Sequence, residues 1–377
     1  MRLMSTAAAA VLFSAGLAAP ATAATGGEYV VVLRAGLAPD TAVATARRLG
    51  SDVRFVYRHA LQGYGGTLTA AALAAARRDP DVALVEAAGT VRASGTQPSP
   101  PWGLDRIDQR ARPLSGTYTW ASSGAGVRAY VIDTGIRYTH ADFGGRAVHG
   151  TDVSATPNGG IDCHGHGTHV AGTIGGSTYG VAKGATLVGV RVLDCAGNAP
   201  VTNVIAAVDW VTADRLTTGA LSPAVANMSL GGGRFDALDL AVRGSILAGR
   251  ISYAVAAGNE AQDACNVSPA RTPEAMTVGA TDSSDRAAGF SNWGSCVDWY
   301  APGVGVTSAG AGSNTGTATM NGTSMASPHV AGVAAQYLAA HPLALPSEVE
   351  AAIRGALTQG VVTGVTSSNN DLLFTNF

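Results

Sequence analysis

The stretch GVRAYVIDTG (residues 126–135) is a short apolar run that ends in Asp133 and a Thr-Gly pair. Four later stretches repeat this pattern, and each ends in polar or glycine-rich residues: TLVGVRVLD (186–194), AVANMSLGGG (224–233), ISYAVAAGN (251–259) and AMTVGAT (275–281). Segments with helical spacing of apolar residues, such as VTNVIAAVDWVTAD, lie between them. Apolar strands that alternate with helices predict an α/β fold with a parallel sheet. Because ligands of such sheets bind beyond the carboxyl ends of the strands, the polar residues there are candidates for function.

The first 24 residues, MRLMSTAAAAVLFSAGLAAPATAA, have the features of a secretory signal peptide. Arg2 is followed by a short apolar stretch and then by small residues that suit signal peptidase. The segment is short and rich in alanine, which argues against a membrane anchor. We therefore predict a signal peptide over residues 1–24, cleaved after Ala23 or Ala24, and a secreted, extracellular protein.

Residues 25–95 have the pattern of a small separate domain. Strand-like stretches at 28–34, 52–58, 65–69 and 82–87 alternate with helix-like stretches at 40–50 and 70–80. The order βαββαβ is typical of a ferredoxin-like α+β sandwich. The stretch ASGTQPSPP (93–101) follows, and its Ser, Gly and Pro residues predict an extended, exposed linker.

Composition argues against several classes of protein. The 377 residues are 46% hydrophobic and 13% charged, and the formal net charge at pH 7 is −2. A chain with so little positive charge is not expected to bind nucleic acid. No apolar run is long enough to cross a bilayer, so no membrane association is expected.

The four cysteines are informative because an oxidising compartment permits disulfide bonds. Cys163, Cys195, Cys265 and Cys296 allow three pairings. No C-x-x-C spacing occurs, which argues against a zinc knuckle. The local pairing, Cys163 with Cys195 and Cys265 with Cys296, would close two loops of about thirty residues. Each such closure stabilises a fold by roughly 3–4 kcal/mol in the chain-entropy model.

Three stretches carry residue types used in hydrolysis. Asp133 ends the first strand, where a carboxylate is equally able to cap the next turn. DCHGHGTHVAGTIGG (162–176) holds three histidines, which suggests either a metal site or one base among structural neighbours. A hydrolytic zinc site typically places a Glu beside the histidines, and no Glu is nearby. NGTSMASPHVAG (321–332) begins a helix of small residues, so Ser324 is either a helix cap or a nucleophile at a helix N-terminus.

The order Asp133, a histidine near residue 166, then Ser324 supplies the set required for acyl transfer. The histidine accepts the serine proton, and the aspartate orients and stabilises the imidazolium. An α/β-hydrolase has the order Ser, Asp, His, and a chymotrypsin-like protein has His, Asp, Ser, so neither arrangement applies. Pro328 is expected in the first turn of the Ser324 helix, where no N–H partner is needed.

These residues bring out a resemblance. The stretches YVIDTGI, HGTHVAG and GTSMASPHVAG resemble the three active-site motifs of the subtilisin family of serine proteases. Within that family they resemble the proteinase K subfamily more closely, and its aqualysin-type secreted proteases most closely. The blocks PWGLDRIDQR, VRVLDCAGN, ANMSLGGG, AVAAGN and GFSNWGSCVDWYAPG are similar to that group, so the likeness runs from Trp102 to the end. It implies a parallel sheet with helices on both faces in a catalytic domain over 96–377. It also implies an inhibitor-type propeptide over 25–95.

The resemblance implies roles for individual residues. Asp133 becomes the orienting acid, His166 the general base and Ser324 the nucleophile, while Asn259 and the Ser324 backbone N–H form an oxyanion hole. His164 stands where relatives often have a small polar residue. The implied substrate-binding residues are Ser229, Leu230, Gly231, Gly232, Ala256, Ala257 and Gly258. Small side chains with no acid among them imply broad specificity and an apolar or aromatic P1 residue.

The cofactor implied by the resemblance is structural calcium, with no catalytic cofactor. One ligand set comprises the carbonyls of Pro273 and Ala275 with the Asp298 carboxylate, and a second comprises Asp105, Asp108 and Gln109. Hard oxygen ligands suit this ion. The alternative for these acids is a solvated surface.

We therefore expect a secreted, monomeric serine endopeptidase that is made as a precursor and acts on proteins and peptides. Its propeptide would assist folding, act as an intramolecular inhibitor and be removed by self-cleavage near Gly95. Two alternatives stay open at this point: a metallohydrolase that uses the histidine cluster, and a non-catalytic, protease-like binding protein.

Overall fold

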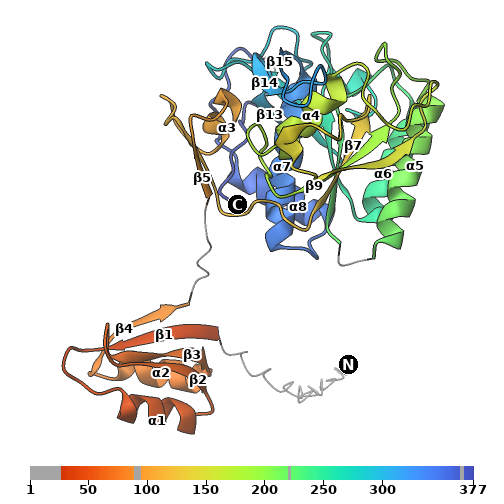
Figure 1. Cartoon of the computed structure of the whole chain (residues 1–377). Coiled ribbons are helices and arrows are strands. Elements are labelled where there is room, and N and C mark those ends of the chain that lie inside the picture. Colours follow the sequence, from red (N-terminus) through yellow and green to blue (C-terminus); the bar gives the residue numbers. More distant parts are fainter. Residues whose placement is uncertain (1–26, 89–94, 220–221, 366–368) are drawn as a thin grey trace, which may run out of the picture. The chain divides into compact units, whose positions relative to one another are not determined.

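The structure is a computed structural model that describes residues 27–88, 95–219, 222–365 and 369–377. The predicted signal peptide lies outside the described residues. The chain divides into two compact units, Met1–Val91 and Arg92–Phe377 (Figure 1). Among the described helices, none combines the length and the apolar character that crossing a bilayer requires.

The first unit is a four-stranded antiparallel sheet with two helices (Figure 1). Its elements are β1 (Gly27–Leu33), α1 (Asp40–Arg48), β2 (Asp52–Tyr57), β3 (Gly63–Leu68), α2 (Ala70–Arg78) and β4 (Val82–Ala87). The strand order is β2-β3-β1-β4, so the predicted βαββαβ sandwich is confirmed. Val31, Val43 and Leu68 are buried in a core of its own. Such a core allows a unit of this size to fold as a domain.

The second unit is built on a seven-stranded parallel sheet of order β13-β12-β11-β10-β7-β9-β8. The strands are β7 (Arg128–Asp133), β8 (Ala147–Asp152), β9 (Thr186–Arg191), β10 (Ala224–Met228), β11 (Ser252–Ala256), β12 (Met276–Thr281) and β13 (Trp299–Pro302). The five predicted apolar runs are the five central strands, which confirms the predicted α/β fold.

Helices cover both faces of this sheet (Figure 1). They are α3 (Trp102–Ile107), α4 (His166–Gly175), α5 (Val201–Thr217), α6 (Asp236–Gly249), α7 (Thr323–Ala340) and α8 (Pro346–Ala356). Ala129 and Val131 of β7 join the core beneath α4 and α7, whereas Tyr130 and Ile132 join the core beneath α5 and α6. Because both faces of the strands are buried, the strands read as continuous apolar runs.

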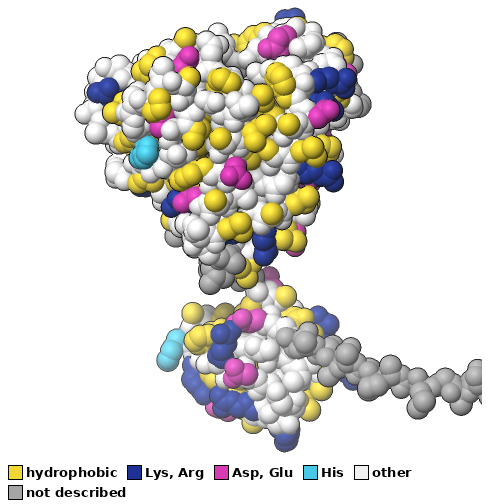
Figure 2. All heavy atoms as spheres, turned by 90° about the vertical axis from the view of Figure 1, so that its right-hand side faces the viewer, with side chains coloured by type: hydrophobic (Ala, Val, Ile, Leu, Met, Phe, Trp, Pro, Cys, Tyr) yellow, Lys and Arg dark blue, Asp and Glu magenta, His cyan; other side chains and the backbone are white. Residues whose placement is uncertain are grey.

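The outer surface of α5 and α6 carries exposed Leu216, Leu240 and Leu247. Figure 2 shows this side of the molecule, where apolar, acidic and basic side chains are interspersed. Isolated apolar side chains of this kind are ordinary on protein surfaces.

Part of the predicted linker is a strand of the second unit. β5 (Gly95–Pro98) pairs antiparallel with β6 (Thr117–Trp120), so these four residues are extended and at least partly exposed as predicted, but they form a strand of this unit and not a linker. Pro98 is tolerated because the pair is a two-stranded edge, where a missing N–H leaves no ladder bond unmade. The remaining short elements are η1 (Ala141–Phe143), η2 (Ala264–Asn266) and the antiparallel pair β14 (Val306–Ala309) and β15 (Thr317–Met320).

The order of the strands reverses between β7 and β10. The chain fills the β9 and β8 side of β7 first and then the β10 to β13 side. The carboxyl ends of β7 and β10 therefore border a crevice, which is where open α/β sheets bind ligands. Asp133 ends β7, and Ser229 directly follows β10. The topology brings the candidate residues of the sequence to this crevice.

Candidate active site

Asp133 and His166 form a hydrogen-bonded pair. Asp133 is 0% exposed, and His166 Nδ1 lies 2.8 Å from its Oδ1 and 3.0 Å from its Oδ2. Burial disfavours the imidazolium ion, but the charge of Asp133 and its hydrogen bond outweigh burial, so the pKa of His166 lies above its ordinary value. The pair therefore has the geometry of a base and the acid that orients it.

The start of α4 can approach the end of β7 because residue 167 is glycine. A Cβ atom on Gly167 would lie 2.2 Å from the carbonyl oxygen of Gly135, a distance that no side chain tolerates. This contact places His166, the first residue of α4, directly beside Asp133.

Asp162 organises the loop that carries His166, a role that the sequence did not reveal. It is 7% exposed and accepts five hydrogen bonds. The donors are the N–H groups of His164, Gly165 and Thr168 and the hydroxyls of Thr134 and Thr168. The only sequence signal is an Asp shortly before a helix with Thr in its first turn, a pattern typical of helix capping.

Ser324, the second residue of α7, makes two hydrogen bonds with Ser229, one through its side chain and one through its backbone carbonyl. Its Oγ donates to the Ser229 carbonyl oxygen at 3.2 Å, and the Ser229 hydroxyl donates to the Ser324 carbonyl oxygen at 2.8 Å. Pro328 lies in the second turn of α7, so the prediction that it occupies the first turn is wrong. Because proline lacks the N–H that would serve the carbonyl four residues earlier, the Ser324 carbonyl accepts from Ser229 instead.

Asn259 is held by Thr323, the residue before Ser324. Asn259 Oδ1 accepts from the Thr323 N–H at 2.8 Å and from the Thr323 hydroxyl at 3.0 Å. The Thr323 hydroxyl in turn accepts from the Gly258 N–H at 3.1 Å. Since the amide oxygen is occupied, the NH₂ group of Asn259 is the part of the amide that remains to serve a ligand.

A cavity of about 750 Å³ brings these groups together. His166, Ser324 and Asn259 line it, and six of the seven predicted substrate-binding residues do so as well: Ser229, Leu230, Gly231, Gly232, Ala256 and Gly258. Ala257 is instead fully buried in a separate apolar cluster, because successive residues at a strand end point in opposite directions. Glu260, which is not among the seven predicted residues, also lines the cavity.

The three histidines do not converge on one point. His169 is buried, its Nε2 donates to the Val306 carbonyl at 2.9 Å, and burial lowers its pKa to about 4. His164 lines the cavity, with its ring centroid 6.2 Å from that of His166. Within the part of the chain that the structure describes, no group of three or more His, Cys, Asp or Glu side chains is arranged to hold a metal ion. The geometry therefore does not favour the metallohydrolase alternative.

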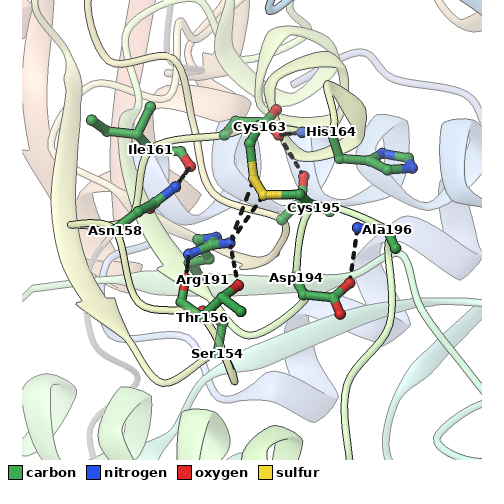
Figure 3. The surroundings of a disulfide bond; sticks show 12 residues. Ser154, Thr156, Asn158, Ile161, Cys163, His164, Arg191, Asp194, Cys195 and Ala196 are labelled. Atoms are coloured by element: carbon green, nitrogen blue, oxygen red, sulfur yellow. Dashed lines mark hydrogen bonds between the residues drawn. A yellow bond between two sulfur atoms is a disulfide. The ribbon is translucent and has the colours of Figure 1, made fainter.

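Both disulfides have the local pairing, Cys163–Cys195 and Cys265–Cys296. The first joins the loop before α4 to the loop after β9, next to buried Arg191 (Figure 3). Arg191 Nη1 donates to the Thr156 carbonyl at 2.6 Å and to Asp152 Oδ2 at 3.0 Å. Because residues on both sides of this disulfide line the cavity, it connects two of the cavity walls.

The first predicted calcium set does not fit a cation in this arrangement. Asp298 Oδ1 accepts from Arg354 Nη2 at 2.8 Å, and Asp298 Oδ2 accepts from the Thr277 N–H at 2.8 Å. Both carboxylate oxygens have donors, and the guanidinium already supplies the positive charge that calcium would bring.

The second predicted set retains an unsatisfied oxygen. Asp108 Oδ1 is buried and lacks a hydrogen-bond partner among the described residues. Burial raises the pKa of Asp108 to about 6, and the nearby charge of Asp105 acts in the same direction. Asp105 Oδ1 and Gln109 Oε1 both accept from the Ser115 N–H, whereas Asp108 Oδ2 accepts from the Thr119 N–H. This donor set fits a hard cation.

Comparison with known proteins agrees with the geometry. The family described as Peptidase_S8, Subtilase family, matches residues 124–370. The chain is 53% identical over 330 residues to an extracellular serine proteinase of Thermus sp. (strain Rt41A), which covers 87% of this chain and 79% of that protein. It is 49% identical over 329 residues to alkaline serine exoprotease A of Vibrio alginolyticus, covering 86% of this chain and 60% of that protein.

A solved structure is also similar. The crystal structure of a cold-adapted subtilisin-like serine proteinase superposes with a TM-score of 0.69 at 50% identity, covering 73% of this chain and 98% of that one. The family model, the relatives and the solved structure agree on the family and the fold of this chain. The chain belongs to the subtilase family and is a serine-type endopeptidase.

Proposed function

We propose that this chain is a secreted endopeptidase that uses Asp133, His166 and Ser324 as its catalytic triad. The observation that carries the proposal is the Asp133–His166 hydrogen bond beside a cavity that Ser324 and Asn259 also line. Secretion is supported by the signal-like first 24 residues and by the similarity to an extracellular proteinase of Thermus.

In the proposed reaction, Ser324 Oγ attacks the carbonyl carbon of the scissile bond while His166 Nε2 accepts its proton. The new C–O bond moves charge onto the carbonyl oxygen, where the Asn259 NH₂ and the Ser324 N–H stabilise it. The proton passes from His166 to the leaving amine as the C–N bond breaks. Water then attacks the acyl-enzyme, again losing a proton to His166, and releases the acid product and free Ser324. Asp133 stays ionised throughout and stabilises the imidazolium.

We propose broad specificity with an apolar or aromatic P1 residue. The support is a cavity wall of small residues, including Gly231, Ala256 and Gly258, whose backbone is available to an extended peptide. Glu260 is the one acidic side chain among the described residues that line the cavity, so an acidic P1 residue is disfavoured. In a peptide series that varies only at P1, Phe and Leu should be cleaved fastest and Asp slowest. A strong preference for Lys or Arg would contradict the proposal.

We propose that residues 25–95 act as an inhibitory propeptide that the enzyme removes itself near Gly95. This is supported by the separate core and sandwich fold of the first unit. Gly95 opens β5, opposite Trp120. We also propose that Asp105, Asp108 and Gln109 hold a structural calcium ion, whose chemistry would be to neutralise these carboxylates and stabilise the loop.

The test compares the whole chain with its Ser324→Ala variant by intact mass over time, with calcium present. If only the wild type loses the segment before about Gly95, Ser324 is the nucleophile and maturation is autocatalytic. If both chains mature alike, another protease makes the cut and self-cleavage is wrong. Labelling by a fluorophosphonate then tests the nucleophile separately, since Ser324→Ala must abolish the label.

A further inference from the structure

Asn292, in the loop between β12 and β13, is a fully buried amide that makes four hydrogen bonds to one neighbouring segment. Its Nδ2 donates to the Ala257 carbonyl and to Glu260 Oε2, both at 2.9 Å. Its Oδ1 accepts from the N–H groups of Glu260 and Gln262, both at 3.0 Å. A side-chain amide offers two donors and two acceptor positions, so Asn292 is saturated.

The segment held in this way, residues 257–262, carries Asn259. Asn292 binds it on both sides of Asn259, at Ala257 before it and at Glu260 after it. Glu260 Oε2 also accepts from the Asn259 N–H at 2.9 Å, so the backbone of Asn259 is linked to the Asn292 amide through one carboxylate oxygen. The Asn292 N–H adds a bond to the Gly258 carbonyl at 3.0 Å.

The fit around Asn292 also requires glycine at residue 258. Gly258 has φ +103°, and a Cβ atom there would lie 2.2 Å from Asn292 Nδ2. The backbone therefore passes directly over the amide, in a conformation that glycine adopts without strain. The side chain of Asn259 is exposed to the cavity, but its backbone is supported from below by this buried amide.

We infer that Asn292 is a positioning residue for the oxyanion hole: its buried amide fixes the 257–262 segment so that the Asn259 NH₂ group points at the developing charge. The inference rests on the proposed role of Asn259. A donor stabilises an oxyanion only when it lies at hydrogen-bond distance from the place the oxygen will occupy, and small displacements are costly in rate. Without Asn292, the Ala257 carbonyl and the N–H groups of Glu260 and Gln262 must remain unpaired or move, and Glu260 Oε2 loses one of its two donors.

The test is a double-substitution cycle on the mature, calcium-loaded enzyme with Asn292→Ala, Asn259→Ala and both together. Asn292→Ala should lower kcat roughly 10- to 100-fold and leave KM for a small peptide amide within about threefold, because the interaction is made in the transition state. Asn259→Ala should lower kcat by roughly 10²–10³. In the Asn259→Ala background, Asn292→Ala should lower kcat by no more than about threefold, since the donor it positions is gone.

The matched control is Gln336→Ala in α7. Gln336 is also a fully buried amide, which donates to the Tyr118 hydroxyl at 2.9 Å and to the Val181 carbonyl at 3.0 Å. It should lower the urea midpoint as Asn292→Ala does, yet leave kcat unchanged. If Asn292→Ala does not fold, Asn292→Asp serves. It keeps an acceptor for the Glu260 and Gln262 N–H groups, and it replaces the two donors by an oxygen that repels Glu260 Oε2 and so displaces the segment.

A second readout separates positioning from general loosening of the fold. The affinity of a peptide boronic acid, which forms a tetrahedral adduct with the nucleophile, should fall with kcat/KM in the Asn292 variants. The affinity of a peptide acid product should stay within about threefold, because it forms no tetrahedral adduct with the nucleophile.

The outcomes are distinguishable. If Asn259→Ala leaves kcat unchanged, the proposed oxyanion role of Asn259 fails, and this inference fails with it. If Asn259→Ala lowers kcat but the Asn292 variants do not, only the positioning role is overturned. The positioning role is also overturned if the double variant loses kcat by the product of the two single losses, because the two residues would then act independently.

Discussion

Ser229 and Ser324 exchange two hydrogen bonds: the Ser229 hydroxyl donates to the Ser324 carbonyl at 2.8 Å, and the Ser324 hydroxyl donates to the Ser229 carbonyl at 3.2 Å. The first bond takes the place of the helical bond that Pro328 cannot make. The proposed nucleophile, Ser324, is thereby held by a residue outside its own helix.

Ser229→Ala should therefore destabilise the fold. It leaves the Ser324 carbonyl without its donor, which costs about 1–3 kcal/mol for a buried group. The measurement is urea unfolding in a Ser324→Ala background, which prevents self-digestion and keeps the carbonyl. Pro328→Ala restores an N–H four residues later and should recover part of the loss in the Ser229→Ala chain. If Ser229→Ala destabilises the chain equally with and without Pro328→Ala, this account is contradicted.

The Asp133–His166 pair predicts the acid side of the pH profile. The base must be neutral to accept a proton, and the pKa of His166 lies above its ordinary value because the charge of Asp133 outweighs burial. As pH falls, kcat/KM for the free enzyme should therefore be lost with a midpoint above about 6.5. Asp133→Asn should lower kcat by roughly 10⁴ and move this midpoint downward. A midpoint that Asp133→Asn leaves in place would assign it to another group.

Two buried histidines predict a loss of stability in acid. Burial lowers the pKa values of His169 and His329 to about 4, so both are neutral when folded at pH 5. The unfolded chain binds protons at these positions below about 6.5, whereas the folded chain does not until about 4. The free energy of unfolding should thus fall as pH drops through this window.

The measurement is urea unfolding of the Ser324→Ala chain between pH 7 and pH 4. Each histidine should contribute roughly 3 kcal/mol to the decline. His329→Gln removes one titrating group and should flatten the slope, although it also lowers stability at pH 7. An unchanged slope in this variant would show that other groups dominate acid unfolding.

The central sheet and the candidate triad were predictable from local sequence. Strands that are buried on both faces have continuous apolar sequences, and polar residues such as Asp133 follow at their carboxyl ends. Strand β5 was not predicted, because Gly95 and Pro98 are typical of loops. Its pairing with β6 is a contact between residues that are distant in the sequence.

Residues that act through tertiary contacts left no readable signal. Asn292 lies 32 residues from Glu260, and Arg354 lies 56 residues from Asp298. The local sequence around a helical arginine does not indicate that its guanidinium will form an ion pair with a carboxylate distant in the sequence. The resemblance suggested calcium ligands from Asp298 but not the partner that this chain places there.

The two candidate cation sites should respond differently to chelation. A carboxyl whose folded pKa is raised destabilises the fold as pH rises from about 4 to about 6, because the unfolded chain loses its proton first. Asp108 is such a group, and a bound calcium ion would reverse this effect. Chelation should therefore lower the melting temperature of the Ser324→Ala chain strongly at pH 8 and little at pH 4.5.

Matched variants assign that effect to a site. Asp108→Asn should abolish most of the difference between calcium and chelator at pH 8, because its unsatisfied oxygen is replaced by a neutral amide. Asp298→Asn should leave the difference intact, since Arg354 and the Thr277 N–H already satisfy that carboxylate. Arg354→Leu should instead add calcium binding in titration calorimetry, because Asp298 loses its guanidinium. If Asp298→Asn abolishes the calcium effect while Asp108→Asn keeps it, the assignment of the two sites is reversed.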